Sequence, residues 1–278
     1  MTIRPTPLSE QSLRQVLVSV VCPFFNEGVV VADAADRMIE NLNAQFGSNW
    51  ELILVNDGST DDSLQQLHDR LSRRNEDAVR VLSYPNNQGR GRALKTGIDA
   101  AVGSIVVTTE ADLSWGEDIV VRLVAELEAY PDAGFVIASP HMAGGGLVNV
   151  PFHRRFFTKF GNLLIKLFFS SKTTMNTGMT RAYRRGVIQP LVTHDDGKEF
   201  HLEVLLKLKT LGFKAREIPA TITWPPKRGF MQKRKKVRKS STRLLNTIGS
   251  HLRFIAIAQP VKYFAMISAL SLLVGIGF

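Results

Sequence analysis

The sequence contains a single cysteine, Cys22, so it can form neither a disulfide framework nor a cysteine-rich zinc site. The N-terminal residues 1–15 lack the apolar segment of a cleaved signal peptide, and we expect none. Internal repeats and low-complexity linkers are missing as well. The 278 residues, 44% of them hydrophobic, suffice for one large α/β domain or for one domain with appendages.

Acidic residues are missing from one strongly basic segment, residues 227–243. Subtracting its nine basic residues from the formal net charge of +10 leaves +1 for the rest of the chain. Such a run is compatible with nuclear targeting, nucleic-acid binding or a juxtamembrane anchor. Its position before an uncharged stretch favours the anchor. We expect no nucleic-acid partner, because no recognition motif or aromatic platform accompanies the basic residues.

Charge is also absent from residues 263–278, which we interpret as part of a transmembrane segment over residues 261–278. Sixteen helical residues would span about 24 Å, less than the roughly 30 Å hydrocarbon core of a bilayer. Either this span is short or the native protein continues beyond the sequence. Because basic residues collect on the cytoplasmic side of membranes, we expect a membrane protein whose preceding domain faces the cytoplasm.

Short apolar runs alternate with helical patterns through the first half of the chain. The expected strands are residues 16–22, 51–55, 79–84, 104–109 and 134–138, and the expected helices are 29–46, 61–75, 90–102 and 117–130. Ser59 or Thr60 is expected to cap the second helix. Further along, residues 199–211 predict a helix and 214–223 a strand. This alternation predicts an α/β fold whose mostly parallel sheet is covered by helices on both faces.

Polar motifs stand where these strands end, and they read "PFFNE", "NDGST", "NNQGRG" and "TEADLSW" along the chain. In open α/β sheets, ligands bind outside the carboxyl ends of the strands. The last motif places two acids, Glu110 and Asp112, at the tip of a buried strand. Taken alone, this pair fits the start of a helix, where acids are favourable, or a Mg²⁺ or Mn²⁺ site shared with substrate phosphates.

In this order, the motifs resemble those of the family 2 glycosyltransferases of the GT-A fold. Within that family the chain is most similar to the dolichol- and polyprenyl-phosphate glycosyltransferases, of the dolichol-phosphate mannose synthase type. The resemblance covers about residues 16–239 and implies four segments. They are an N-terminal extension (1–15), a GT-A catalytic domain (16–226), a basic juxtamembrane segment with an amphipathic helix (227–260) and the transmembrane segment (261–278).

The resemblance implies roles for individual residues. Glu110 and Asp112 occupy the metal-binding D-x-D position, with Asp112 the expected direct ligand of Mg²⁺ or Mn²⁺, and Arg181 belongs to a catalytic motif. Asp57 is expected to contact the nucleotide base, although it could merely shape a turn, and Lys95 could lie on a solvated face. The implied nucleotide-binding residues are Pro23, Phe24, Asn26, Glu27, Asp57, Asn87, Gly89, Lys95 and Ala111.

The chain departs from the family pattern at three places. Glu110 stands where the family usually has aspartate, which lengthens the acidic side chain by one methylene. Pro140, in "ASPHM", replaces an arginine that would face phosphate. The motif that holds Arg181 reads "TGMTRAY" and is one residue longer than usual. These departures leave the expected fold unchanged but leave the sugar and the base of the donor open.

The activity that the resemblance implies is an inverting, metal-dependent transfer of a sugar from a GDP- or UDP-linked donor to a polyprenyl phosphate. An acceptor phosphate is largely ionised near neutral pH, so the reaction needs no strong general base. Cations must then offset the repulsion between the two phosphates, and guanidinium groups match phosphate oxygens well. The candidates for the acceptor phosphate are Arg154, Arg155, Arg181, Arg228 and Lys233.

Residues 152–169 mix phenylalanines with four basic side chains. Phenylalanines are typical of a core helix, but unpaired cations are not, so an interfacial membrane helix is favoured. Two alternatives to the transferase stay open. One is a degenerate GT-A domain that acts as a membrane scaffold, and the other is a glycosyltransferase with a polysaccharide acceptor. The second is disfavoured because the chain has "TITWPPKRG" in place of the "Q-x-x-R-W" motif of such enzymes.

Overall fold

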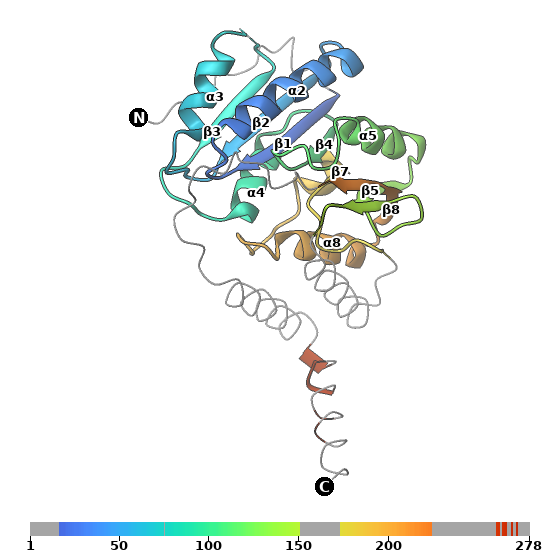
Figure 1. Cartoon of the computed structure of the whole chain (residues 1–278). Helices are drawn as coiled ribbons and strands as arrows, with labels where there is room; N and C mark the ends of the chain where they lie inside the picture. The colour runs from blue at the N-terminus through green and yellow to red at the C-terminus, as the bar shows by residue number, and fades with distance from the viewer. Residues whose placement is uncertain are drawn as a thin grey trace.

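A computed structural model describes residues 17–74, 76–150 and 173–223, together with residues 260, 261, 263–265, 268 and 271. Its elements follow the expected alternation of strands and helices (Figure 1). In chain order they are β1 (Val18–Phe24), α2 (Val29–Phe46), β2 (Trp50–Asn56), α3 (Ser63–Leu71), β3 (Val79–Ser83), α4 (Arg90–Ala100), β4 (Ile105–Thr108), α5 (Ile119–Ala129), β5 (Ala133–Ser139), β6 (Gly146–Val148), β7 (Arg181–Arg184), α7 (Arg185–Ile188), α8 (Phe200–Thr210), β8 (Lys214–Pro219) and β9 (Thr221–Thr223).

The main sheet has seven strands in the order β3-β2-β1-β4-β7-β5-β8. All neighbours pair in parallel except β7, which runs antiparallel to both β4 and β5. The prediction of a mostly parallel sheet is therefore confirmed. Strand β7 was not predicted, because the short "RAYR" stretch has no long apolar run to announce it. It is nevertheless the strand that joins the two parallel halves of the sheet.

Helices cover both faces of this sheet, as the sequence predicts. On one face, apolar residues of α2, α3 and α5 pack against alternate residues of β1, β2 and β4. On the other face, α4, α7 and α8 pack against the intervening residues of the same strands and of β5 and β7. Figure 1 shows these two layers of helices with the sheet between them. Strands β1, β2, β4 and β5 are consequently buried along their whole length, which explains their continuous apolar runs.

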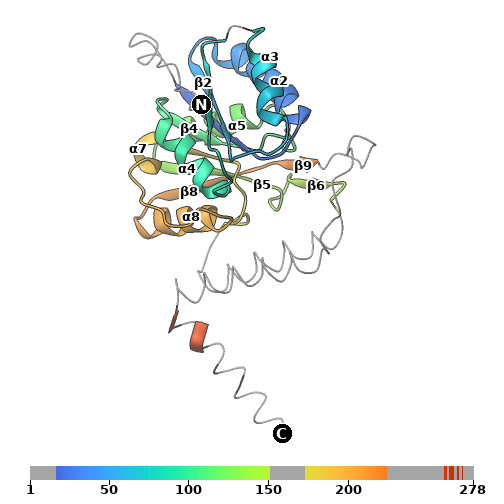
Figure 2. The ribbon, with the colours of Figure 1, turned by 90° about the vertical axis from the view of Figure 1, so that its left-hand side faces the viewer.

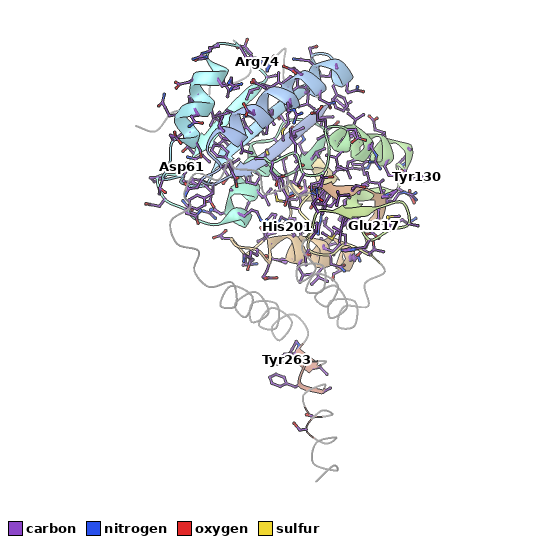
Figure 3. All side chains as sticks on the ribbon, in the orientation of Figure 1. Asp61, Arg74, Tyr130, His201, Glu217 and Tyr263 are labelled. Carbon is purple, nitrogen blue, oxygen red and sulfur yellow. The ribbon has the colours of Figure 1, made fainter. Side chains whose placement is uncertain are left out.

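The expected strand over residues 214–223 is in fact two strands. β8 ends at Pro219, and β9 leaves the main sheet to pair in parallel with β6. Figure 2 shows β6 and β9 side by side beyond the main sheet. At the outer edge of the main sheet, the Arg216 guanidinium lies 3.3 Å from the centre of the Tyr130 ring, which Figure 3 labels. This contact and a bond from Arg216 to Glu126 connect the edge strand β8 to α5.

The amino ends of the central strands hold one buried carboxylate, that of Glu51 on β2. Its side chain is 0% exposed and forms an ion pair with Arg80 on β3. It also accepts hydrogen bonds from the Ser19 hydroxyl and from the backbone N–H of Val102, the latter at 2.7 Å. This network joins β1, β2 and β3 to the turn before β4, and it leaves the Glu51 charge fully partnered.

The sequence analysis also predicted a membrane-spanning segment. Among the parts of the chain that the structure describes, no helix is both long and apolar enough to cross a membrane. Most of the expected transmembrane segment, residues 261–278, lies outside the described residues. The same holds for residues 152–169 and for the basic segment. The interfacial helix, the juxtamembrane segment and the span therefore stay predictions.

Candidate active site

A pocket of about 150 Å³ opens at the carboxyl ends of β1 and β4, beside the first turn of α4. Three of its lining side chains are acidic, Glu27, Glu110 and Asp112, and one is basic, Arg90. The other lining residues are Pro23, Ala111 and Met179. A second hollow, between α2 and the loop before α5, has room for only about 10 Å³, and its two charged residues pair with each other. The first pocket is the candidate active site.

Asn26 fixes the loop that follows β1. Its backbone has a φ of 54°, the left-handed conformation that asparagine tolerates better than most residues. Its side-chain oxygen accepts hydrogen bonds from the backbone N–H of Thr60 and Asp61, and its own N–H donates to the Ser59 hydroxyl. Ser59 and Thr60 therefore brace the neighbouring loop and do not cap α3, which begins only at Ser63. The predicted cap was wrong.

Asp57 organises the loop between β3 and α4. Its carboxylate accepts hydrogen bonds from the backbone N–H of Gln88 (2.8 Å) and Gly89 (3.1 Å) and from the side-chain amide of Asn87 (2.8 Å). The side chain is only 4% exposed. This geometry fits the alternative in which Asp57 shapes the loops, while its contact with a nucleotide base stays a prediction.

Gly58 lets these two loops come together. Gly58 has a φ of +68°, and a Cβ atom added to it would lie 2.3 Å from the backbone carbonyl carbon of Asn86. Real Cβ atoms do not approach backbone atoms so closely, so any other residue would push the loops apart. The glycine of "NDGST" is thus explained by close packing and by its left-handed backbone.

The two acids of the "TEADLSW" motif do not cap a helix, because α5 begins at Ile119. One oxygen of the Glu110 carboxylate accepts hydrogen bonds from the Ser114 hydroxyl (3.1 Å) and the Trp115 indole N–H (3.0 Å). One oxygen of Asp112 accepts the backbone N–H of Ser114 at 3.0 Å. In the described part of the chain, the second oxygen of each carboxylate has no hydrogen-bond donor and is available to a ligand.

Burial and the charges of the acids together raise the pKa of two groups at the pocket. Burial raises the pKa of Glu110, and the nearby Asp112 charge raises it further, while Arg90 and the Ser114 and Trp115 hydrogen bonds act in the opposite direction. The pKa of the Cys22 thiol is raised as well, first by burial and then by the charges of Asp112, Glu110 and Glu27. The pocket is therefore a region of concentrated negative charge.

This donor set suits a divalent cation that is shared with a ligand. Mg²⁺ and Mn²⁺ prefer oxygen ligands and often complete their coordination with phosphate oxygens and water. Among the described residues, no group of three or more His, Cys, Asp and Glu side chains is arranged to hold a metal by itself. Glu110 and Asp112 would hold such an ion together with oxygens of a phosphate ligand, which is how the two free carboxylate oxygens could be used.

The other predicted residues fall into two groups. Pro23 and Ala111 line the pocket with Glu27, whereas the Phe24 side chain belongs to the hydrophobic core. Lys95 lies away from the pocket, with its ammonium group 3.4 Å from the Thr193 carbonyl. Arg154, Arg155, Arg228 and Lys233 lie outside the described residues, so their contact with an acceptor phosphate stays a prediction.

Arg181 is buried where a site residue was predicted. Its side chain is 0% exposed and donates to the carbonyls of His201 (2.8 Å) and Asn176 (2.7 Å). His201, labelled in Figure 3, lies on α8 next to this guanidinium. In this conformation Arg181 holds the segment before β7 against α8, and a substrate phosphate cannot reach it. A catalytic contact of Arg181 would require a rearrangement of this packing.

The sequence analysis missed two residues that line the pocket, Met179 and the charged Arg90. Arg90 belongs to the "NQGRGRALKTG" motif, but nothing in the sequence distinguishes it from an ordinary charged residue in the first turn of a helix. Only the placement of α4 beside the ends of β1 and β4 shows that this guanidinium faces three carboxylates. Its position directly after Gly89 was the one available signal.

Comparisons with known proteins agree with this site. A family model described as "Glycosyl transferase family 2" matches residues 19–191, more than half of the chain. The chain belongs to this family. The matched range contains all but the first residue of β1, the strands β2 to β7 and all the described pocket residues, so the candidate active site lies within the family 2 match.

Relatives within glycosyl transferase family 2 include enzymes named for polyprenyl phosphates. The dodecaprenyl-phosphate galacturonate synthase of Rhizobium johnstonii is 32% identical over 46% of this chain and 37% of its own length. The undecaprenyl-phosphate 4-deoxy-4-formamido-L-arabinose transferase of an Enterobacter species is 30% identical over 73% of this chain and 58% of its own length. The chain thus spans about a third to three fifths of the length of these relatives.

Solved structures show the same fold. The glucosyl-3-phosphoglycerate synthase of Mycobacterium tuberculosis, solved with Mn²⁺, UDP and phosphoglyceric acid, matches with a TM-score of 0.62 at 18% identity. The match covers 91% of this chain and 80% of that one. The same synthase solved with Mg²⁺ and UDP gives a TM-score of 0.61 over 91% and 81% of the two chains. At this identity the likeness establishes the GT-A fold alone.

Proposed function

We propose that this chain transfers a sugar from a nucleoside-diphosphate sugar to a polyprenyl phosphate at a membrane surface. The observation that carries the proposal is the pocket in which Glu110 and Asp112 present free carboxylate oxygens at the end of β4. Membership in family 2 and the polyprenyl-phosphate relatives support it. The M. tuberculosis synthase, solved with UDP and Mn²⁺ or Mg²⁺, supports the same kind of donor and ion.

In the proposed reaction, an oxygen of the acceptor phosphate attacks the anomeric carbon of the sugar. The bond from that carbon to the diphosphate breaks, and the nucleoside diphosphate leaves with the bonding electrons. A single displacement of this kind inverts the anomeric centre. A divalent ion at Glu110 and Asp112 would supply charge neutralisation for the leaving diphosphate. The protein's task is then to bind and align the two substrates and to exclude water.

The described residues around the pocket are consistent with a reaction that needs no general base. No histidine is among the residues that line it. His201, behind the pocket, is 1% exposed, and its pKa is held well below the ordinary value by burial and by the charges of Arg90 and Arg181. Because the acceptor phosphate is already anionic near neutral pH, it can attack without losing a proton to the enzyme.

We further propose that the enzyme works at the cytoplasmic face of a membrane. Support comes from the nine basic residues of the segment 227–243 and from the uncharged stretch that follows it. A basic segment next to a span attracts anionic headgroups and favours a cytoplasmic position. The acceptor lipid would then reach the pocket from the membrane side.

A donor panel tests the proposed function. The full chain is incubated with undecaprenyl phosphate, Mn²⁺ or Mg²⁺, and a series of UDP- and GDP-sugars, and the glycolipid product and released nucleoside diphosphate are measured. The proposal predicts metal-dependent product from at least one donor. Binding of nucleotide without any turnover would support the membrane scaffold instead. Sugar transfer to a polysaccharide, with none to the lipid, would support the other alternative.

A further inference from the structure

Arg90 enters the pocket with its hydrogen-bonding capacity unused. Its side chain is exposed to the pocket, and in the described part of the chain the guanidinium makes no hydrogen bond and no ion pair within 4 Å. The surrounding protein desolvates it and lowers its pKa, while the charges of Glu110 and Glu199 raise it. An arginine remains charged under such a balance, because its ordinary pKa is above 12. Five N–H donors are therefore available.

The charge balance of the pocket shows what these donors are for. The three lining carboxylates and Arg90 give the pocket a formal charge of −2. The charge of one divalent ion would be balanced by Glu110 and Asp112 alone, yet the diphosphate of a donor brings further negative charge. Of the cations that line the described pocket, Arg90 is the one that remains to meet it. A planar guanidinium is well suited to two phosphate oxygens at once.

The backbone on both sides of Arg90 is held by contacts with neighbouring segments. Directly before it, the N–H groups of Gln88 and Gly89 are held by Asp57. Directly after it, a Cβ on Gly91 would come within 2.8 Å of the Asp195 carbonyl, and the N–H of Arg92 donates to the Asp196 carbonyl. Glu203 on α8 fixes that opposing loop by accepting the Asp195 N–H at 2.9 Å. The backbone that carries the Arg90 side chain is therefore held in place on both sides, which limits the positions that the guanidinium can reach.

The place of Arg90 along the chain separates donor from acceptor. The loop of Asn87 to Gly89, which the family resemblance assigns to the nucleotide, lies immediately on one side of it. Glu110 and Asp112, the acids that would hold the metal, line the same pocket as Arg90. A ligand that extends from the nucleotide loop to these acids passes Arg90 with its diphosphate. The acceptor phosphate has to approach from the opposite side of the sugar if the displacement inverts the anomeric carbon.

We propose, as an extension of the proposed function, that Arg90 binds the diphosphate of the donor and stabilises the charge that develops on it as it leaves. Arg90 is then a catalytic residue, and the wall of the pocket formed by α4 is part of the diphosphate site. Arg181, which the motif suggested for phosphate contact, is buried and bonded to two carbonyls in this conformation, and its contact with phosphate stays a prediction.

The test compares Arg90→Gln and Arg90→Lys with the wild type and with Arg92→Gln. Arg92 is a matched control, because it lies on the same helix and its 45% exposed side chain faces Asp196, 3.8 Å away, outside the pocket. Binding of UDP and GDP with Mn²⁺ to the full chain is measured by calorimetry. Uridine and guanosine serve as ligands without phosphate, and donor and acceptor KM and kcat are measured with the active donor.

For Arg90→Gln we expect the affinity for the nucleoside diphosphate to fall roughly 10- to 100-fold, the usual effect of losing hydrogen bonds to a charged group. Nucleoside affinity should change less than about threefold, and kcat should fall with diphosphate affinity because the contact strengthens as charge develops. Arg90→Lys should recover part of the lost diphosphate affinity, since lysine keeps the positive charge but lacks the planar pair of N–H donors of a guanidinium. Arg92→Gln should match the wild type.

Two outcomes would overturn the inference while leaving the proposed function intact. One is diphosphate affinity in Arg90→Gln equal to that of the wild type. The other is a rise in acceptor KM alone, which would assign Arg90 to the acceptor phosphate. If the wild type binds neither UDP nor GDP with Mn²⁺, the proposed function fails, and the role of Arg90 fails with it.

Discussion

Both ends of the central strands carry carboxylates, but the carboxylates at the two ends differ in burial and in the partners that the fold supplies. At the amino ends, Glu51 is fully buried, paired with Arg80 and bonded to Ser19 and a backbone N–H. At the carboxyl ends, Glu110 and Asp112 line the same pocket, and no ion pair neutralises either within the described residues. The same residue type thus serves stability at one end and is left available at the other.

This difference gives a criterion that distinguishes charged side chains that stabilise the fold from charged side chains that can bind a ligand. A buried ion whose partners are all supplied by the fold contributes to stability and has nothing left to bind a ligand with. Burial and the nearby Asp112 charge raise the pKa of Glu110, and each of the two carboxylates keeps a free oxygen, so a bound cation would relieve the repulsion between them. By the same criterion, Arg181, which is buried and donates to two backbone carbonyls, fits a structural role, whereas Arg90, which makes no hydrogen bond among the described residues, fits the proposed role in binding a ligand.

The largest expected effect is on activity at the carboxyl end. Asp112→Asn should reduce turnover at least about 1,000-fold, equivalent to about 4 kcal/mol of transition-state stabilisation. Asp112 is exposed, so the free energy of unfolding should change by less than about 0.5 kcal/mol. Product formation and urea unfolding are measured on the same preparation. Near-normal turnover would show that Asp112 holds no essential ion.

Glu51→Gln is the counterpart at the amino end. It leaves Arg80 without its charged partner and weakens the bonds from Ser19 and Val102, so we expect the free energy of unfolding to fall by about 3 kcal/mol. Nucleoside diphosphate affinity of the folded fraction should stay within about twofold of wild type, because Glu51 lies at the other end of the strands. If Glu51→Gln kept the free energy of unfolding of the wild type but bound the nucleotide more weakly, the roles assigned to the two ends of the strands would be reversed.

His201 offers a smaller, pH-dependent test in the layer between sheet and α8. The folded protein keeps it neutral, whereas the unfolded chain takes up a proton below pH about 6.5. Its contribution to stability is therefore present above that pH and lost as the pH falls. Between pH 7.5 and 5.5 the wild type should lose about 1.4 kcal/mol more than His201→Gln. Urea unfolding at both pH values measures this, and equal losses would show that His201 is protonated in the fold.

The smallest expected effect is that of Glu110→Asp. Restoring the aspartate that is usual in the family keeps the charge and shortens the arm by one methylene. The bonds from Ser114 and Trp115 to this carboxylate are then stretched. We expect activity to remain, with turnover within about tenfold of wild type, less than about 1.4 kcal/mol. A loss as large as that of Asp112→Asn would show that the longer arm is required here.

Much of this site follows from the sequence, because its residues stand at the ends of apolar runs. The five expected strands and four expected helices of the first half were predicted close to their observed bounds. The acids of "TEADLSW" were predicted from the same rule and do line the pocket. Local signals suffice here, since each parallel strand brings its own carboxyl end to one edge of the sheet.

The roles of Arg90, Asp57 and Arg181 depend on contacts between distant segments. Whether an arginine is bonded to carbonyls or faces a pocket is decided by the packing of α4 and α8 against the sheet, and no local pattern records this. Strand β7 was missed for a similar reason, because it is stabilised by two antiparallel neighbours that lie far away in the sequence. Whether each side chain is buried among bonding partners or lines the pocket, rather than its residue type, therefore distinguishes these roles.

The most direct measurement of the central claim is calorimetric titration of the full chain with UDP and GDP, in Mn²⁺ and again in excess EDTA, for the wild type and for the double variant Glu110→Gln, Asp112→Asn. If the free carboxylates at the end of β4 bind the donor through a shared ion, the wild type binds one of the two nucleotides with Mn²⁺, and EDTA or the double variant weakens that binding at least about tenfold. Equally tight binding under all of these conditions would contradict the account.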